Sequence, residues 1–407
     1  MPEQSAVVIV VDGLGAGWTG PYGNTWIETP GLNQLAAQSV IAETLIADAP
    51  DLAGAYRAYW SGRHALAATS PIRQSLADLA AAVGLQTLLI TDERAVATHP
   101  LAGGFAKLTF FEPPASASSA RAIEKTALFQ FFANAAATLE ECDRASLVWL
   151  HSRGLTGCWD APLEYRNQFA DEDDPPPPAF VAPPARTLSA AGDPDELLGL
   201  SQACAGQVVL LDQCLEMFLD AVSAHPILRD CPLIFTSPRG YPLGEHLHVG
   251  HNHGSLYGEL LHVPLLLRLS QQDHALARLR QIAQPHGLFA TIANICSWPS
   301  LTTLSPGILA ELTAAEVPPE AAYSIAANQR SIRTPAWFLR ESLHEDQKRF
   351  ELFAKPDDRF EANEISGRCP RIVEMLADRL DEFSASVAQD PPAEIAPLAE
   401  PLCDTWR

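Results

Sequence analysis

The chain has 407 residues, of which 47% are hydrophobic and 19% are charged, and its formal net charge is −22. This composition predicts a large buried core, with one main domain and one smaller domain. The strong negative charge argues against nucleic acid or an anionic membrane surface as a partner. We therefore expect the partner to be a small molecule or a protein, whose identity the composition leaves open.

The amino-terminal segment, MPEQSAVVIVVDG, lacks the basic region of a signal peptide, and its apolar run ends at Asp12. No apolar segment approaches the roughly 20 residues that span a bilayer. The eight cysteines are scattered and form no C-x-x-C pair, which is typical of reduced thiols. These features together predict a cytoplasmic protein.

Short apolar runs alternate with helical patterns along the first three hundred residues. Such alternation is typical of βαβ units, so it predicts an α/β fold with a mainly parallel central sheet sandwiched by helices. The expected strands are 6–11, 87–90, 147–150, 233–236 and the apolar run 263–267. Three helices are expected: one begins at Thr29-Pro30, one begins after Asp51, and one covers 198–223.

Two stretches depart from this alternation. Residues 171–186 are acidic and then proline-rich, which predicts an extended surface excursion because proline cannot join a strand ladder. The pattern also changes after about residue 300, where Trp337-Phe338-Leu339 and a final helix over 370–384 are expected. We therefore predict an α/β domain over residues 1–310 and a small α+β subdomain over residues 311–407.

The segment from Cys231 to Leu269 carries the clearest motifs. A buried strand runs into Thr236-Ser237, the chain turns through Pro238-Arg239-Gly240, and a histidine-rich loop and a second apolar run follow. This order of motifs resembles that of the sulfatases of the alkaline-phosphatase superfamily. In that family the corresponding segment reads roughly FTSDHG, GEH, Y-E-E and R-V-P-L. Further matches in the same order are Tyr22-Gly23-Asn24, Thr29-Pro30, Ser61-Gly62-Arg63, His262-Val263-Pro264-Leu265 and Glu351-Leu352-Phe353.

The resemblance implies a sulfatase fold and descent from sulfuric ester hydrolases, but several implied catalytic positions are changed. The family needs a Ca²⁺ or Mg²⁺ ion on oxygen ligands, and of the two Asp expected after the first strand only Asp12 is present, followed by Gly13. The formylglycine nucleophile, made from Cys or Ser, falls at Leu52, and Pro238-Arg239 replace the last metal carboxylate and its neighbour. We therefore expect the Ca²⁺/Mg²⁺ site and formylglycine-dependent hydrolysis to be lost.

Other polar residues remain as candidates for a pocket at the carboxyl ends of the strands. Arg57 lies one place beyond the implied sulfate-binding arginine, and Asp92-Glu93 stand where the resemblance implies a lysine. The two acids are either paired carboxylates for acid–base work or the start of a helix. The pocket candidates are Arg57, His151, Arg239 and His251, and Arg153 and Arg239 are candidates for an anion site.

Four histidines in the loop after the strand at 233–236 offer a second kind of site. His246, His248, His251 and His253 lie within eight residues and could hold Zn²⁺ together with Asp12, since Zn²⁺ takes four N, S or O ligands. The competing interpretation is a solvated loop that corresponds to the family's own G-E-H loop.

Three functions follow from these residues. The favoured hypothesis is a non-catalytic, sulfatase-like protein that keeps its pocket for binding or regulation. The second is an active enzyme that performs metal-assisted ester hydrolysis with Asp12 and the 246–253 histidines. The third is a structural or partner-binding protein that uses the exposed 171–184 segment.

Overall fold

The computed structural model describes residues 4–67, 72, 74–189, 193–251, 255–298, 307–312, 320–345, 347–390 and 392–404. Its strands are β1 (Ala6–Val11), β2 (Val40–Ala42), β3 (Leu45–Ile46), β4 (Gln86–Thr91), β5 (Lys107–Phe110), β6 (Ser146–Ser152), β7 (Arg186–Thr187), β8 (Leu233–Thr236), β9 (His248–Val249), β10 (His262–Val263), β11 (Leu265–Arg268), β12 (Arg278–Leu279), β13 (Ala322–Ala326), β14 (Gln329–Arg333), β15 (Trp337–His344) and β16 (Gln347–Ala354). Its α-helices are α1 (Pro30–Ala37), α2 (Leu52–Ser61), α3 (Leu76–Ala82), α4 (Arg94–Ala97), α5 (Ala127–Leu139), α6 (Leu163–Asn167), α7 (Pro194–Ala224), α8 (Gly258–Leu261), α9 (Gly287–Ile295) and α10 (Pro370–Val387).

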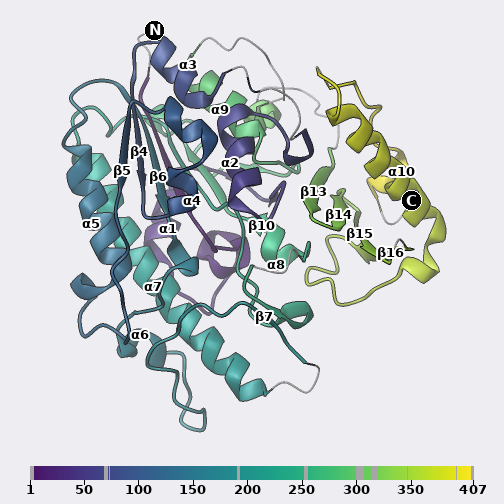
Figure 1. Ribbon diagram of the computed structural model, residues 1–407, viewed down its shortest axis with the longest axis horizontal. Coiled ribbons are helices and arrows are strands. Elements are labelled where there is room, and N and C mark those ends of the chain that lie inside the picture. Colours follow the sequence, from purple (N-terminus) through teal and green to yellow (C-terminus); the bar gives the residue numbers. More distant parts are fainter. Residues whose placement is uncertain are drawn as a thin grey trace.

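An eight-stranded sheet in the order β12-β2-β11-β8-β1-β6-β4-β5 forms the centre of the molecule (Figure 1). β1 lies between β6 and β8 and is parallel to both, with Val8 opposite Trp149 and Ile234. Only β11 runs antiparallel to its neighbours β8 and β2 in this sheet. The mainly parallel sheet predicted from the alternating pattern is therefore confirmed.

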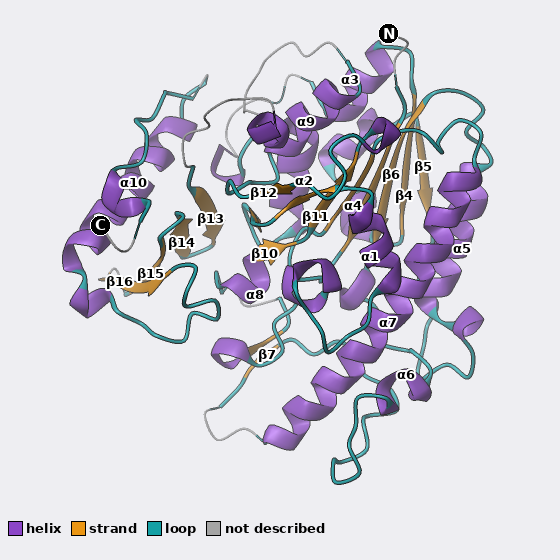
Figure 2. Cartoon of the chain, turned by 180° about the vertical axis from the view of Figure 1, so that it is seen from behind, coloured by secondary structure: helices purple, strands orange, loops and turns teal. Residues whose placement is uncertain are grey.

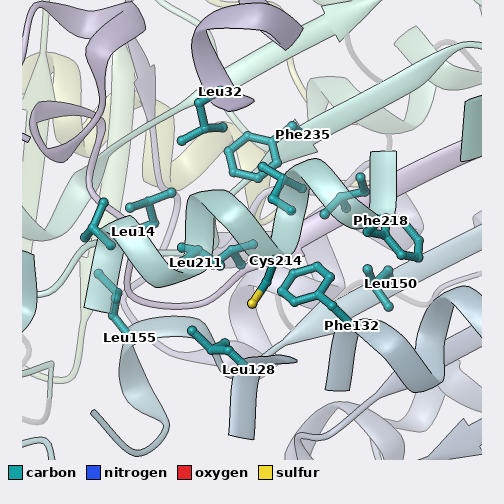
Figure 3. Packing of buried hydrophobic residues seen from close by; sticks show 14 of the residues in the cluster. Leu14, Leu32, Leu128, Phe132, Leu150, Leu155, Leu211, Cys214, Phe218 and Phe235 are labelled. Carbon is teal, nitrogen blue, oxygen red and sulfur yellow. The ribbon is translucent and has the colours of Figure 1, made fainter. Parts of the chain in front are cut away.

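The apolar run of β1 is long because both faces of the sheet are covered by helices. Val7, Ile9 and Val11 pack on one face with side chains of α1, α5 and α7, and Figure 3 shows Leu211 and Phe218 of α7 in this cluster. The alternate residues of β1 pack on the other face with side chains of α2, α3 and α9. Figure 2 shows the strands lying between these helices. The main core therefore has two halves, one on each side of the sheet.

The expected elements differ from the observed ones mainly at their ends. The single apolar run 263–267 is divided at Pro264, because proline has no N–H to donate to a ladder. His262–Val263 instead pairs with β3, while Leu265–Arg268 joins the central sheet. The helix expected after Asp51 is present, with the Asp51 side chain accepting a hydrogen bond from the Gly54 amide, and it ends at Gly62 in the left-handed conformation.

Helix α1 is held at its start by an acid from far along the chain. The carboxylate of Asp212, on α7, accepts hydrogen bonds of 2.8 Å from the amides of both Gly31 and Leu32. Asp212 is 1% exposed, so these two amides have no ready access to water as a substitute partner.

Replacing Asp212 by alanine is therefore expected to lower the free energy of unfolding by about 2 kcal/mol, because two buried amide donors lose their acceptor. Urea unfolding monitored by circular dichroism would measure the loss. Asp212→Asn keeps one acceptor oxygen and should lose less. If the alanine variant matched the wild type, this contact would contribute nothing to holding α1.

A second sheet of four antiparallel strands, in the order β13-β14-β15-β16, follows the main domain, and α10 packs against it. Figure 1 shows this sheet and helix beside the main domain. A small apolar cluster joins the two parts, with Tyr257 and Leu261 from the main domain against Phe338 and Phe353. The division into residues 1–310 and 311–407 stays a prediction, and it places the whole second sheet in the smaller unit.

The segment 171–186 is an irregular excursion from the main domain, between α6 and β7. Only its last residue, Arg186, belongs to a strand that the structure describes, which is β7. Its residues are mostly exposed or half-buried, as its acidic and proline-rich composition predicted. None of the helices that the structure describes is both long enough and apolar enough to cross a membrane.

Candidate functional site

The candidate site lies where the parallel strands of the central sheet end. Asp12 directly follows β1, Asp92 follows β4, and His151 lies near the end of β6. The turn after β8 carries Arg239. Because the carboxyl ends of parallel strands meet at one edge of a sheet, residues more than two hundred positions apart come together there.

Arg239 forms a bidentate ion pair with Asp12 at this edge. The guanidinium Nε donates to Oδ1 of Asp12 at 2.9 Å, and Nη2 donates to Oδ2 at 2.8 Å. Its third nitrogen, Nη1, donates to the carbonyl of Pro50 at 3.0 Å. Both side chains are buried, with Asp12 at 0% and Arg239 at 8% exposed. This guanidinium is therefore bonded to a carboxylate of the chain itself, and an anion site at Arg239 stays a prediction.

The charge state of this pair follows from its geometry. Burial alone would raise the pKa of Asp12, but the adjacent Arg239 outweighs that effect and holds the pKa below its usual value. Burial would lower the pKa of Arg239, and Asp12 reverses that, so its pKa is raised. The Thr156 hydroxyl shares its one proton between the Arg153 carbonyl at 2.8 Å and Oδ2 of Asp12 at 3.2 Å. Both partners are therefore ionised and well supplied with hydrogen bonds at neutral pH.

The turn that carries Arg239 is held in place on both sides. The Ser237 hydroxyl donates to the Arg239 carbonyl at 2.6 Å, and the Tyr59 hydroxyl donates to the Ser237 carbonyl at 3.0 Å. The next residue, Gly240, lies so close to Glu259 that a Cβ atom on it would be 2.0 Å from the Glu259 carbonyl oxygen. The backbone contacts therefore fix the position of the Arg239 Cα atom, and Asp12 fixes the position of its guanidinium group.

The residues at this place do not fit the Ca²⁺ or Mg²⁺ ion that the sulfatase resemblance implies. Such an ion needs six or more oxygen ligands, and both oxygens of Asp12 are bonded to Arg239. Gly13 and Pro238 bring no side-chain oxygen to complete a coordination sphere. A guanidinium 2.8 Å from the carboxylate also repels a second cation.

The position implied for the nucleophile also lacks the required chemistry. Leu52 is the first residue of α2, and its hydrocarbon side chain has no atom that can attack an ester. Arg57, proposed as a substitute for the sulfate-binding arginine, donates to the carbonyl of Ala67 at 2.6 Å. Tyr56 occupies the implied arginine position itself.

Tyr56 and His151 form a buried pair next to Asp12. The Tyr56 hydroxyl lies 2.5 Å from Nδ1 of His151, and both residues are 0% exposed. Burial, opposed by Asp12, lowers the pKa of His151 to about 4, so the imidazole is neutral near pH 7. Burial raises the pKa of Tyr56 well above its usual value, so the hydroxyl keeps its proton and donates to Nδ1. Nε2 of His151 is buried and has no hydrogen-bond partner within the described ranges.

The two acids after β4 are directed to different partners. Glu93 accepts from the amide of Ala95 at 2.9 Å and caps α4, while Asp92 accepts from the amide of Arg153 at 2.8 Å. This arrangement agrees with the helix-start interpretation. Burial raises the pKa of Asp92 to about 7. Nε of Arg153 lies 3.3 Å from Oε2 of Glu93, so this arginine, like Arg239, is paired with an acid of the chain itself.

The histidines of the loop 246–253 that the structure describes have different partners. Nδ1 of His246 lies 2.9 Å from Glu259, Nε2 lies 3.1 Å from the carbonyl of Glu361, and the ring stacks on Tyr257. His248 belongs to β9, which pairs with β7. His251 lies near enough to Asp12 to contribute to lowering its pKa.

Asp12, His246, His248 and His251 do not form a group of three possible ligands within 4.8 Å of one another, and His253 falls outside the described residues. The zinc hypothesis therefore stays a prediction that the described part of the loop does not support.

One other group in the described residues has the composition of a metal site: Asp48, His64 and His286. Its hydrogen bonds indicate a structural role instead. Nε2 of His64 donates to the carbonyl of Tyr323 at 2.8 Å, and Nδ1 accepts from the amide of Leu66 at 3.1 Å. Both ring nitrogens are thus used, and the group links the main domain to β13.

Sequence reasoning missed the roles of Tyr56 and Thr156 at this site. The motif alignment placed Tyr56 at the implied arginine but did not pair it with His151, which is 95 residues away. Thr156 stands near a position at which the sulfatase resemblance implies a histidine, but its contact with Asp12 was not predicted. The alignment itself was the one available signal, because both residues coincide with positions at which the resemblance implies catalytic groups.

Comparison with known proteins gives one family and many similar folds. The family model described as Sulfatase matches residues 4–296, and no curated protein matches the chain. A phosphonate monoester hydrolase of Agrobacterium radiobacter has a TM-score of 0.75 and 14% identity, over 94% of this chain and 96% of that one. A protein solved with its substrate D-glucosamine-2-N,6-O-disulfate has a TM-score of 0.75 and 13% identity, over 96% of this chain and 99% of that one.

A 2-O GAG sulfatase has a TM-score of 0.72 and 15% identity, over 95% of this chain and 93% of that one. At these identities the structures establish the fold alone, whereas the family model covers most of the chain. The α/β domain, its carboxyl-edge site and the match over residues 4–296 agree: the chain belongs to the sulfatase family of the alkaline-phosphatase superfamily.

Proposed function

We propose that this chain is a non-catalytic member of the sulfatase family, which uses the fold for binding or regulation and not for formylglycine-dependent ester hydrolysis. The observation that carries the proposal is the bidentate ion pair between Asp12 and Arg239. It places a permanent cation of the chain on the one carboxylate retained from the implied metal site. Leu52 adds support, because a leucine at the nucleophile position cannot form a covalent ester intermediate.

The same ion pair suits a stable, rigid site. A buried ion pair persists when its hydrogen bonds are satisfied, and here Thr156 and the Pro50 carbonyl add two more. The neutral His151 beside it does not compete for the carboxylate. The buried pair therefore suits a rigid binding site better than a reactive one.

We also propose that the protein works in a reducing compartment, the cytoplasm. All eight cysteines are free thiols, and five of them are buried. Buried thiols that face no partner cysteine suit a cell compartment in which disulfides are not formed.

The proposal is tested by assaying hydrolysis of 4-nitrophenyl sulfate and 4-nitrophenyl phosphate by the purified protein, with Ca²⁺, Mg²⁺ or Zn²⁺ added. Asp12→Asn combined with Arg239→Met provides the matched control, because it removes both charges of the pair together. We expect the wild type and this double variant to give the same rate as buffer. Turnover by the wild type that is lost in the double variant would contradict the proposal.

Metal analysis of the same preparation separates the rebuilt-enzyme alternative. We expect no stoichiometric zinc. One zinc ion per chain, lost in the variant His248→Ala/His251→Ala, would favour metal-assisted hydrolysis at the histidine loop over the non-catalytic role.

A further inference from the structure

Three aromatic rings, those of Trp18, Trp26 and Phe169, lie next to one another at the surface of the main domain. The ring centroids of Trp26 and Phe169 are 4.9 Å apart, and those of Trp18 and Trp26 are 6.5 Å apart. Trp26 is 48% exposed, while Trp18 and Phe169 are half-buried and pack on the main core. We call these three residues the aromatic face. It joins the loop before α1 to the chain just after α6.

The exposure of Trp26 is fixed by the structure of its loop. Oδ1 of Asn24 accepts from the amide of Trp26 at 2.9 Å and from that of Ile27 at 2.8 Å. Nδ2 of Asn24 donates to the carbonyl of Gly17 at 2.9 Å. Ile27 is 1% exposed, so this turn places Ile27 in the core and leaves Trp26 at the surface. A large ring held outward in this way offers contact area to a partner at little conformational cost.

An acidic turn follows Phe169 directly. Asp171, Glu172 and Asp173 are all exposed, and Figure 1 shows the segment that begins with them projecting from the main domain beyond α6. None of these three carboxylates has a hydrogen-bond or ion-pair partner among the residues that the structure describes. Three like charges therefore lie side by side at the surface with no counter-charge from the chain itself.

A fourth acid, Asp174, holds the turn in shape. Its Oδ2 accepts from the amide of Asp171 and from Nε2 of Gln202, both at 3.0 Å. Gln202 lies on α7 and is 0% exposed, and its Nε2 also donates to the carbonyl of Phe169 at 3.3 Å. A single buried amide group therefore ties both the acidic turn and the aromatic face to α7.

The chain beyond the acidic turn is fixed as well. Arg166, which is 0% exposed, donates to the carbonyls of Trp159 and Pro178. The amide of Trp159 donates to the carbonyl of Val181 at 3.3 Å, and Val181 packs in the main core. The acidic turn is thus anchored on both sides, so little conformational freedom is left to lose when a partner binds to it.

The closeness of rings and acids determines what can bind there. Phe169 and Asp171 are two residues apart, so a partner that covers the rings also removes water from the carboxylates. Glu28, two residues after Trp26, is exposed too and has no ion-pair partner within the described ranges. Covering a carboxylate without a counter-charge is unfavourable. The partner must therefore bring cations together with its apolar contacts.

Charge excludes several other partners. A second copy of this chain carries the same net charge of −22 and would bring acids against acids. Nucleic acid and an anionic membrane have the wrong sign as well. Arginine meets both requirements, because its guanidinium pairs with carboxylates through two hydrogen bonds and also stacks on aromatic rings.

We propose that the aromatic face and the acidic turn together dock an arginine-rich segment of another protein. Its guanidinium groups pair with Asp171, Glu172 and Asp173, and one of them stacks on Trp26. This surface includes neither Asp12 nor Arg239, so binding here is independent of whether the Asp12 site is catalytic.

Fluorescence anisotropy of the full-length chain with a fluorescein-labelled peptide, in which arginine alternates with alanine and leucine, tests the proposal. The salt concentration is about 0.15 M, where long-range attraction to the acidic chain is screened beyond about 8 Å. We expect saturable binding of one peptide per chain, and no binding of the same peptide with glutamine in place of arginine. The variant Asp171→Asn/Asp173→Asn should weaken binding about tenfold. The matched control, Glu374→Gln/Asp378→Asn, removes two exposed acids of α10 and should bind as the wild type does.

Trp26→Ala tests the ring contact separately and should weaken peptide binding about fivefold. Leu343→Ala, at a residue of β15 that is 44% exposed, is its control and should leave binding unchanged. The substituted side chains are all at the surface, so the variants should fold normally, which circular dichroism would verify. Absence of binding at millimolar peptide would overturn the proposal. So would an equal loss in the α10 control, which would show unspecific attraction to an acidic chain, or unchanged binding by Trp26→Ala.

Discussion

Replacing Arg239 by methionine is expected to lower the free energy of unfolding by about 3–5 kcal/mol, because it leaves the carboxylate of Asp12 buried without its counter-ion. Asp12 is 0% exposed, so water cannot take over the two lost hydrogen bonds. Urea unfolding at pH 8, followed by circular dichroism and by tryptophan fluorescence, measures this loss.

The cost should also depend on pH. Without Arg239, burial would raise the pKa of Asp12, and the variant could relieve the buried charge by taking up a proton. In the wild type Arg239 keeps that pKa low, so the wild type gains no such relief. The difference in stability between variant and wild type should therefore shrink as the pH falls from 8 to 4.

Two further variants show whether the loss comes from the pair itself. Asp12→Asn/Arg239→Met removes both charges and should be considerably more stable than Arg239→Met alone. Arg153→Met serves as the control, because this arginine pairs with Glu93 near the surface with 36% of its side chain exposed. Its loss should be below about 1 kcal/mol. A double variant as unstable as Arg239→Met would show that the loss arises from packing and not from the unpaired carboxylate.

The second large effect concerns His151 and pH. Its pKa in the folded protein is about 4, below the ordinary value of 6.5. Between these two values the unfolded chain binds a proton that the folded chain does not, so His151 makes stability fall as the pH falls from 6.5 to 4. The contribution over this window is about 3 kcal/mol.

The variant His151→Asn isolates this contribution, since asparagine keeps an acceptor for the Tyr56 hydroxyl and does not titrate. Unfolding free energies of wild type and variant, measured from pH 7.5 to 4, should show a smaller acid-induced fall in the variant. The same substitution at the exposed His274 controls for the loss of an imidazole elsewhere. Parallel curves for wild type and His151→Asn would mean that this imidazole gains its proton as readily in the folded protein as in the unfolded chain.

Much of the fold could be predicted from local patterns. The run at 6–11 is apolar at every position, and a strand covered on both faces requires that pattern. The cap at Asp51 and the left-handed Gly62 similarly bound α2 by interactions within a few residues. The break at Pro264 was missed, although proline was visible, because an apolar run alone does not reveal which sheet each half joins.

The candidate site was predicted less completely. The motif alignment showed that Leu52 cannot act as the nucleophile, and that conclusion depends on residue identity alone. It did not reveal that Arg239 binds Asp12, since these residues are 227 positions apart and the arginine could equally have paired with surface acids.

The sequence by itself determined the family, the strand and helix pattern, and the presence of Leu52 at the position implied for the nucleophile, because these follow from residue type and short-range spacing. The tertiary structure alone decided which charges meet. Parallel strands bring Asp12 and Arg239 to one edge of the sheet, although they lie 227 positions apart along the chain. Electrostatic pairing depends on distance through space and on burial, and neither quantity can be read from position along the chain.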